Sequence, residues 1–322
     1  MVNAFAQTHW IGKFLMLAGI YLLGEVAFGL MSMYVVDLLI PAAGFRELIM
    51  SMSGNTDAPQ FTSAQINALQ LYQALTSLGR FILVGYLFLR LMDQTAIAYL
   101  HLNSCIHPRS ILLLLLIAVF ATGSISIITE WNQNMHLPSF LHGFEESARK
   151  MESAAEAQTK AFLSTASVSG FIVNLLVIGV IAAIAEEYFF RGVLLRTVLD
   201  GTRKPHFAIW FSAFFFSLIH YQFFGFFPRL ILGAILGYLF YWSGSLWASI
   251  IAHFFNNAMS VVGYFFIARG TVSESSTDPN PWVASLVSLP IFILLLIAFR
   301  KQESYKWKWN GERLDDGIHN NG

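Results

Sequence analysis

Long, unbroken apolar runs are the feature of this sequence that most limits what it can fold into. A helix needs about 20 apolar residues to cross the ~30 Å hydrocarbon layer of a bilayer, whereas a membrane-spanning β-strand has about ten residues of alternating character. The runs here do not alternate, so we expect an all-α, polytopic membrane protein with about eight transmembrane helices. The expected spans are 14–39, 66–91, 111–128, 168–195, 207–223, 230–242, 246–268 and 282–299.

The composition excludes a soluble globular protein. Hydrophobic residues make up 56% of the chain and charged residues only 12%, whereas a soluble domain has about 25% charged residues. Nineteen basic residues balance nineteen acidic ones, so the chain has no basic field that would attract nucleic acid. The single cysteine, Cys105, excludes an internal disulfide and any CxxC redox pair.

We expect a single membrane domain over residues 1–322, with the functional core within 166–268. Residues 129–165 form the one long connection, and they carry two Glu/Lys pairs at the i,i+4 spacing that supports an exposed amphipathic helix, Glu146/Lys150 and Glu156/Lys160. Residues 301–322 form a polar tail in which Lys and Trp alternate over 306–309. Such side chains suit the headgroup zone of a membrane.

The distribution of Lys and Arg predicts the orientation in the membrane. If the N-terminus is inside, the inner loops carry more Lys and Arg residues than the outer loops do. Arg229 is counted among the residues of the outer loops. The positive-inside rule therefore predicts that both termini and the tail are cytoplasmic. The compact loops favour a bacterial plasma membrane.

Ionisable residues within the spans are functional candidates, because a charge at the bilayer centre costs at least ~2.5–3.5 kcal/mol. The fourth span contains the adjacent carboxylates Glu186 and Glu187, followed by Arg191. Glu187 and Arg191 have the i,i+4 spacing and order that favour an ion pair. Adjacent side chains point about 100° apart on a helix, so this pair would leave Glu186 free to face another group.

Two further helices supply polar groups of the same kind. His220 ends the fifth span, and a turn near residues 200–205 would place it and Glu186 about 21–23 Å from that turn on antiparallel neighbours. His253 and Asn257 share one face of the seventh span, and Asn256 points elsewhere. Taken singly, these could be a hydrogen-bonded histidine, a structural ion pair and an asparagine that joins helices. Together they favour a site. We interpret the remaining intramembrane polar residues as packing or interfacial groups: Glu25, Asp37, Arg80 and Asn174.

Three motifs of this sequence resemble a known family. They are Glu186-Glu187-x-x-x-Arg191, Phe216-x-x-x-His220 and His253-x-x-x-Asn257, and they resemble the motif set of the CAAX prenyl protease type II family, the CPBP or Abi group. The resemblance implies an intramembrane endopeptidase, a hydrolase. In such an enzyme Glu186 and His220 would activate water, and His253 and Asn257 would stabilise the oxyanion. Glu187, Arg191 and Phe216 would support these groups.

The resemblance permits a metal-free glutamate mechanism, which we prefer, with no cofactor. Alternatively, Glu186, His220 and His253 could bind a divalent metal such as zinc with one position open to water, although the chain has no HExxH motif. The expected partners are a peptide or membrane-protein substrate and the lipid bilayer. Two rival interpretations are a non-catalytic bacteriocin-immunity or scaffold protein that binds a peptide, and a proton-coupled transporter that uses Glu186 and His220 as a relay.

Overall fold

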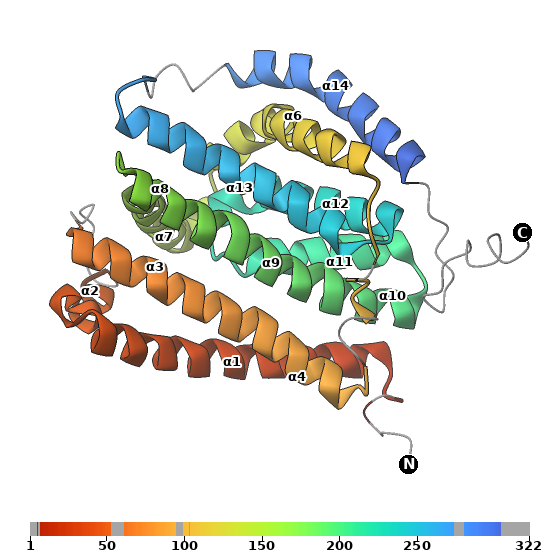
Figure 1. Ribbon diagram of the computed structural model, residues 1–322, viewed down its shortest axis with the longest axis horizontal. Helices are drawn as coiled ribbons and strands as arrows, with labels where there is room; N and C mark the ends of the chain where they lie inside the picture. Colours follow the sequence, from red (N-terminus) through yellow and green to blue (C-terminus); the bar gives the residue numbers. More distant parts are fainter. Residues whose placement is uncertain are drawn as a thin grey trace, which may run out of the picture.

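A computed structural model describes residue 5 and residues 7–52, 61–94, 99–102, 104–273 and 280–303. All regular structure within these ranges is helical, without strands, so the expected all-α fold is confirmed (Figure 1). The helices are α1 (Trp10–Leu39), η1 (Pro41–Ala43), α2 (Phe45–Met52), α3 (Ser63–Ser77), η2 (Leu78–Leu83), α4 (Val84–Leu91), α6 (Pro108–Gln133), η3 (Ser139–Leu141), α7 (His142–Leu163), α8 (Val168–Asn174), η4 (Leu175–Ile181), α9 (Ala182–Glu187), η5 (Tyr188–Leu195), α10 (Arg196–Thr202), α11 (Pro205–Leu218), η6 (Phe223–Gly225), α12 (Phe226–Ser243), α13 (Leu246–Ala268) and α14 (Pro281–Gln302).

Six continuous helical segments of the described chain are long and apolar enough to cross a membrane: Trp10–Leu39, Ser63–Leu91, Val168–Thr202, Phe223–Ser243, Leu246–Ala268 and Pro281–Gln302. The helix α6 is a seventh candidate that bends by 40° between Ser124 and Ser126. The expected fifth span, α11, has only 14 residues. At about 1.5 Å per residue, α11 is shorter than the hydrocarbon layer. The expected number of about eight spans is therefore reduced to six or seven among the described residues.

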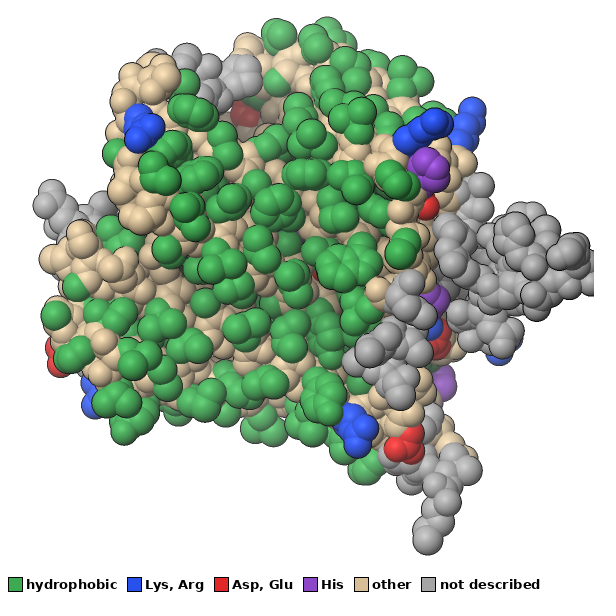
Figure 2. All heavy atoms as spheres, in the orientation of Figure 1, with side chains coloured by type: hydrophobic (Ala, Val, Ile, Leu, Met, Phe, Trp, Pro, Cys, Tyr) green, Lys and Arg blue, Asp and Glu red, His purple; other side chains and the backbone are tan. Residues whose placement is uncertain are grey.

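The surface of the bundle has the apolar belt of an integral, multi-pass membrane protein. Figure 2 shows hydrophobic side chains covering the middle of one face, with charged side chains at its two ends. Leu23 on α1 and Leu286 on α14 are examples of large apolar side chains that are mostly exposed. Such a surface is stable only where lipid covers it.

Three neighbouring helices share a fixed register that positions the site. The Ser212 hydroxyl of α11 donates to the Phe190 carbonyl oxygen at 2.8 Å, and α11 runs antiparallel to the α9–α10 helix after the turn at Thr202–Pro205. The Arg191 guanidinium donates to the Gly233 carbonyl oxygen of α12 at 2.8 Å. One turn further along both helices, Gly237 packs against Leu195. The helix α12 therefore runs parallel to α9–α10 with a constant offset of 42 residues (233 − 191 and 237 − 195).

The connection between α6 and α8 contains the expected exposed helix, α7. Lys150 and Glu146 form the predicted i,i+4 ion pair at 2.8 Å. The N–H of Leu137 and the Arg149 guanidinium lower the pKa of Glu145 to about 2, so this carboxylate stays charged and holds the first turn of α7 to the preceding loop. Figure 1 places α7 at the end of the bundle opposite to the start of α1 and the end of α14.

The first two residues of the polar tail expected over residues 301–322, Lys301 and Gln302, are the last two residues of α14. Beyond Glu303, the tail, including Lys306 to Trp309, lies outside the described residues.

Candidate active site

Glu187 and Arg191 form a fully buried ion pair at the centre of the bundle. Their side chains are 0% and 1% exposed, and the Arg191 Nη1 donates to Glu187 Oε1 at 2.6 Å. Arg191 also donates to the Gly233 carbonyl oxygen and lies 4.6 Å from the centre of the Phe216 ring. A charge in this environment is stable only when it is paired and hydrogen-bonded. The pairing predicted from the i,i+4 spacing is confirmed, and it joins α9, α11 and α12.

His253 of α13 completes this buried cluster. Its Nδ1 lies 2.8 Å from Glu187 Oε1, and its Nε2 lies 3.9 Å from Glu186 Oε2. Since a carboxylate oxygen only accepts, the Nδ1 carries the proton and donates to Glu187. The histidine is thus oriented by one glutamate and directed at the other, a contact that its place in the sequence did not predict.

Glu186 remains the free carboxylate of the pair. Its side chain is 13% exposed, and it makes no hydrogen bond to the described residues. Its electrostatic partners are Arg191, His220 and Arg229. A carboxylate surrounded by cations and imidazoles, but bonded to none of them, is available to hold a water molecule or a substrate group.

His220 lies two residues beyond the end of α11 and folds back onto that helix. Its Nδ1 is 2.7 Å from the Phe216 carbonyl oxygen, so Nδ1 carries the proton and the lone pair of a neutral ring is on Nε2. The Phe216 ring packs against both histidines, at 5.1 Å from His220 and 6.0 Å from His253. Because α11 runs antiparallel to the α9–α10 helix, the Ser212–Phe190 contact places Phe216 at the same depth as Glu186. His220 is four residues further along the chain, so it lies within about one helical turn of that depth.

Asn257 is bonded to a neighbouring helix. Its side-chain amide donates to the Ile178 carbonyl oxygen at 2.9 Å, within the π-helical segment η4. The neighbouring Asn256, expected on another face of the helix, donates from its side-chain amide to Asn257 Oδ1 at 3.3 Å. Asn257 therefore has a packing contact irrespective of any part in catalysis.

The donor set does not fit a metal centre. The described part of the chain contains no group of three or more His, Cys, Asp or Glu side chains that could hold an ion. The alternative zinc set of Glu186, His220 and His253 is therefore not assembled as a ligand shell. The Glu187 Oε2, which is buried and has no hydrogen-bond partner among the described residues, belongs to the ion-pair cluster.

Sequence reasoning missed a second polar group, on the loop after His220. Arg229, counted as an outer-loop charge, lies in the first turn of α12, and its Nη2 donates to Gln222 Oε1 at 2.6 Å. Glu152 of α7 accepts from Gln222 Nε2 and from the Phe224 N–H, both at 3.1 Å. Burial raises the pKa of Glu152, and Arg229 opposes that shift. The only sequence signal was a lone arginine at the start of an apolar run.

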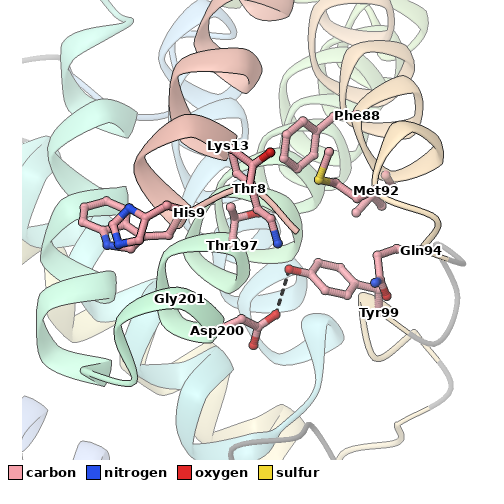
Figure 3. Close-up of a pocket in the computed structure, with 12 residues that line it drawn as sticks. Thr8, His9, Lys13, Phe88, Met92, Gln94, Tyr99, Thr197, Asp200 and Gly201 are labelled. Atoms are coloured by element: carbon pink, nitrogen blue, oxygen red, sulfur yellow. Dashed lines mark hydrogen bonds between the residues drawn. The ribbon is translucent and has the colours of Figure 1, made fainter. Parts of the chain in front are cut away.

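Two cavities lie near this helix group. An apolar one of about 370 Å³ flanks His220, with Ile219, Tyr221, Phe189 and Phe190 in its wall. A more polar one of about 270 Å³ lies about three to four turns beyond Glu186, where Tyr99 donates to Asp200 at 2.9 Å (Figure 3). None of the motif residues lines either cavity, but the apolar one is lined by Ile219 and Tyr221, the chain neighbours of His220.

Comparison with known proteins agrees with the motif set. Residues 168–259 match the family model described as type II CAAX prenyl endopeptidase Rce1-like. The match contains all three motifs and confirms the resemblance. The comparison with curated proteins and the comparison with solved structures gave no match.

Proposed function

We propose that this chain, which carries an Rce1-like type II CAAX prenyl endopeptidase domain at residues 168–259, is an intramembrane endopeptidase that uses water activated by Glu186 and His220. The division of the two glutamates supports the proposal. Glu187 is held by Arg191 and His253, while Glu186 faces the Nε2 of His253 without a hydrogen bond. A structural ion pair needs only one carboxylate. The second carboxylate, Glu186, lowers the stability of the fold, and a catalytic role would explain why it is present.

In the proposed reaction, the Glu186 carboxylate takes a proton from water, and the resulting hydroxide attacks the carbonyl carbon of the substrate peptide bond. The Nε2 lone pair of His220 orients the same water. The C–N bond breaks as the leaving nitrogen receives the proton that Glu186 accepted. The products are a carboxylic acid and an amine, so one water is consumed for each bond cleaved.

The oxyanion of the tetrahedral intermediate needs donors beside Glu186. His253 can donate from Nε2 only as an imidazolium, because its Nδ1–H already donates to Glu187. The buried Glu187 carboxylate stabilises that cation. Asn257 donates to Ile178, and a side-chain amide has a second N–H that can serve the oxyanion. These donors would act on charge that develops only in the transition state.

The surroundings of the site favour an apolar peptide or membrane-protein substrate. The apolar cavity of about 370 Å³, which the neighbours of His220 in the chain, Ile219 and Tyr221, help to line, can receive a large apolar side chain or another apolar group of the substrate. The lipid-facing belt brings membrane-bound substrates to the same depth.

The test is to incubate purified protein in lipid nanodiscs with a solubilised membrane proteome and to count new peptide termini by mass spectrometry. We expect the parent to generate termini and Glu186→Gln to lose this by about 10²–10⁴-fold in kcat, because glutamine keeps the shape but not the basicity. Glu47→Gln, at an exposed carboxylate of α2, is the control that should match the parent. An active Glu186→Gln protein would refute the role of Glu186. A parent that generates no termini would favour the non-catalytic binding interpretation.

A further inference from the structure

Arg229 lies at the same depth in the bundle as the two glutamates. The parallel helices α12 and α9–α10 keep an offset of 42 residues, through Arg191 with Gly233 and Leu195 with Gly237. One turn before Gly233 and Arg191, the same offset places Arg229 at the depth of Glu187. Arg229 also interacts electrostatically with Glu186 and with His220. A second arginine, besides Arg191, therefore faces the candidate site from α12.

The guanidinium of Arg229 has an unused donor. Its Nη2 donates to Gln222 Oε1 at 2.6 Å, but its Nη1 is buried and has no hydrogen-bond partner among the described residues. A buried donor without a partner is unfavourable, and more so when it is charged. Such a group is retained where an anion completes it, and guanidinium groups match carboxylates in geometry.

The segment around Arg229 is held in place before any substrate arrives. The carboxylate of Glu152 accepts two hydrogen bonds from the loop, one from Gln222 and one from Phe224. The buried Asn132 of α6 accepts from the Phe227 N–H at 3.0 Å and donates to the Phe223 carbonyl oxygen at 3.2 Å. A Cβ at Gly225 would lie 2.9 Å from the Arg229 Nη2, so glycine leaves the room that the guanidinium occupies.

We infer that Arg229 binds a carboxylate of the substrate through its Nη1 and so selects which peptide bond reaches Glu186. This inference rests on the proposed endopeptidase function. A peptide offers a carboxylate either at its C-terminus or on an Asp or Glu side chain, and an uncharged internal segment offers none. Arg229 is then a specificity-determining residue, distinct from the Glu187–Arg191 pair that supports the fold of the site.

The test uses synthetic octapeptides with randomised apolar positions, prepared as pools with a free C-terminal acid, with a C-terminal amide, and as amides with one internal Glu or Gln. Cleavage is followed by mass spectrometry for the parent, Arg229→Gln and Arg229→Lys. We expect the parent to prefer a carboxylate-bearing pool by about 10- to 100-fold in kcat/KM, mainly through KM. Arg229→Gln should bring that ratio to about 1, and Arg229→Lys should give an intermediate ratio. Arg269→Gln, at an exposed arginine, should keep the parent ratio.

The arms of the experiment separate the possible outcomes. A preference for the acid over the amide identifies the C-terminal carboxylate, and a preference for Glu over Gln identifies an acidic side chain. A parent that cleaves all pools equally, or an Arg229→Gln protein that keeps the parent preference, would overturn the inference. If the parent cleaves nothing, the proposed function fails. In that case thermal shifts of the Glu186→Gln protein, with and without Arg229→Gln, decide the inference separately, since equal shifts by the carboxylate-bearing and carboxylate-free pools would contradict it.

Discussion

At the scale of single residues, two adjacent glutamates have different surroundings because neighbouring helix positions point about 100° apart. Glu187 faces Arg191 and the Nδ1 of His253, and Glu186 faces the Nε2 of His253. Arg191 has no water to replace a lost partner, since both members of the pair are buried. The two carboxylates should therefore respond differently to the same substitution.

We expect Glu187→Gln to lower the free energy of unfolding by about 3–5 kcal/mol, because it leaves a buried charge without its counterion. Thermal unfolding in detergent measures this. Adding Arg191→Met should recover part of the loss, since the two charges are then removed together. Glu146→Gln is the matched control, because Glu146 and Lys150 have the same i,i+4 spacing but are exposed, and it should change stability little. A Glu187→Gln protein as stable as the parent but inactive would reverse the roles of Glu186 and Glu187.

The residue contacts that could be predicted are the local ones. The Glu187–Arg191 pair follows from helical periodicity alone. The bond between His253 and Glu187 joins residues 66 positions apart, and it depends on how α13 packs against α9. For the same reason the sequence did not predict that Glu25 and Arg80, interpreted as packing or interfacial groups, pair with each other at 3.1 Å across α1 and η2. The site motifs were visible in the sequence, but their mutual bonds were not.

At the scale of elements, His220 depends on a segment that is held from outside the spans. The helix α11 ends at Leu218, and the chain then turns through Tyr221, which has a positive φ of 54°. The α7 helix holds the following loop through Glu152. Loops with few such contacts open at low free energy, so α7 stabilises the position of His220.

Replacing Glu152 by Gln should loosen this loop without changing any motif residue. We expect faster amide hydrogen exchange over residues 221–225 and a turnover several-fold below that of the parent, because a neutral acceptor holds Gln222 and the Phe224 N–H less strongly. Glu156→Gln, at an exposed position one turn later on α7, is the control and should leave both unchanged. Faster exchange with full turnover would mean that α7 does not support His220.

Helix existence was predictable because apolar run length directly reflects what a bilayer requires. The interruptions of the regular α-helices were not predictable from run length. The π-helical segments η2, η4 and η5 contain no proline. The bend in α6 between Ser124 and Ser126 lies at the Gly123-Ser124 pair, a kind of pair at which helices kink, but apolar run length does not reveal it. The shortness of α11 follows from the turn that brings His220 back onto Phe216, which apolar character alone does not show.

At the scale of the whole molecule, different segments of the chain form the two ends of the bundle (Figure 1). The described chain begins and ends at one of them, and α7 lies at the other (Figure 1). The Cys105 segment belongs to the first end, because the neighbouring His107 N–H donates to Glu303 Oε1 at 2.8 Å, just after α14. The positive-inside rule predicts that this end is cytoplasmic and that the α7 end is outside. The loop after His220, held by α7, would then face the outside.

The single cysteine makes this orientation measurable. Cys105 is exposed and is the only thiol in the chain, so a membrane-impermeant maleimide should label it in inside-out vesicles and not in intact spheroplasts of a bacterial host. A Cys105→Ser chain carrying Ser147→Cys, at an exposed position of α7, should show the reverse pattern. Both patterns exchanged would refute the positive-inside prediction and place α7 in the cytoplasm. Labelling of both cysteines from the same side would contradict the arrangement of the bundle itself. In that arrangement the start of α6 and the end of α14 lie at the end of the bundle opposite to α7 (Figure 1).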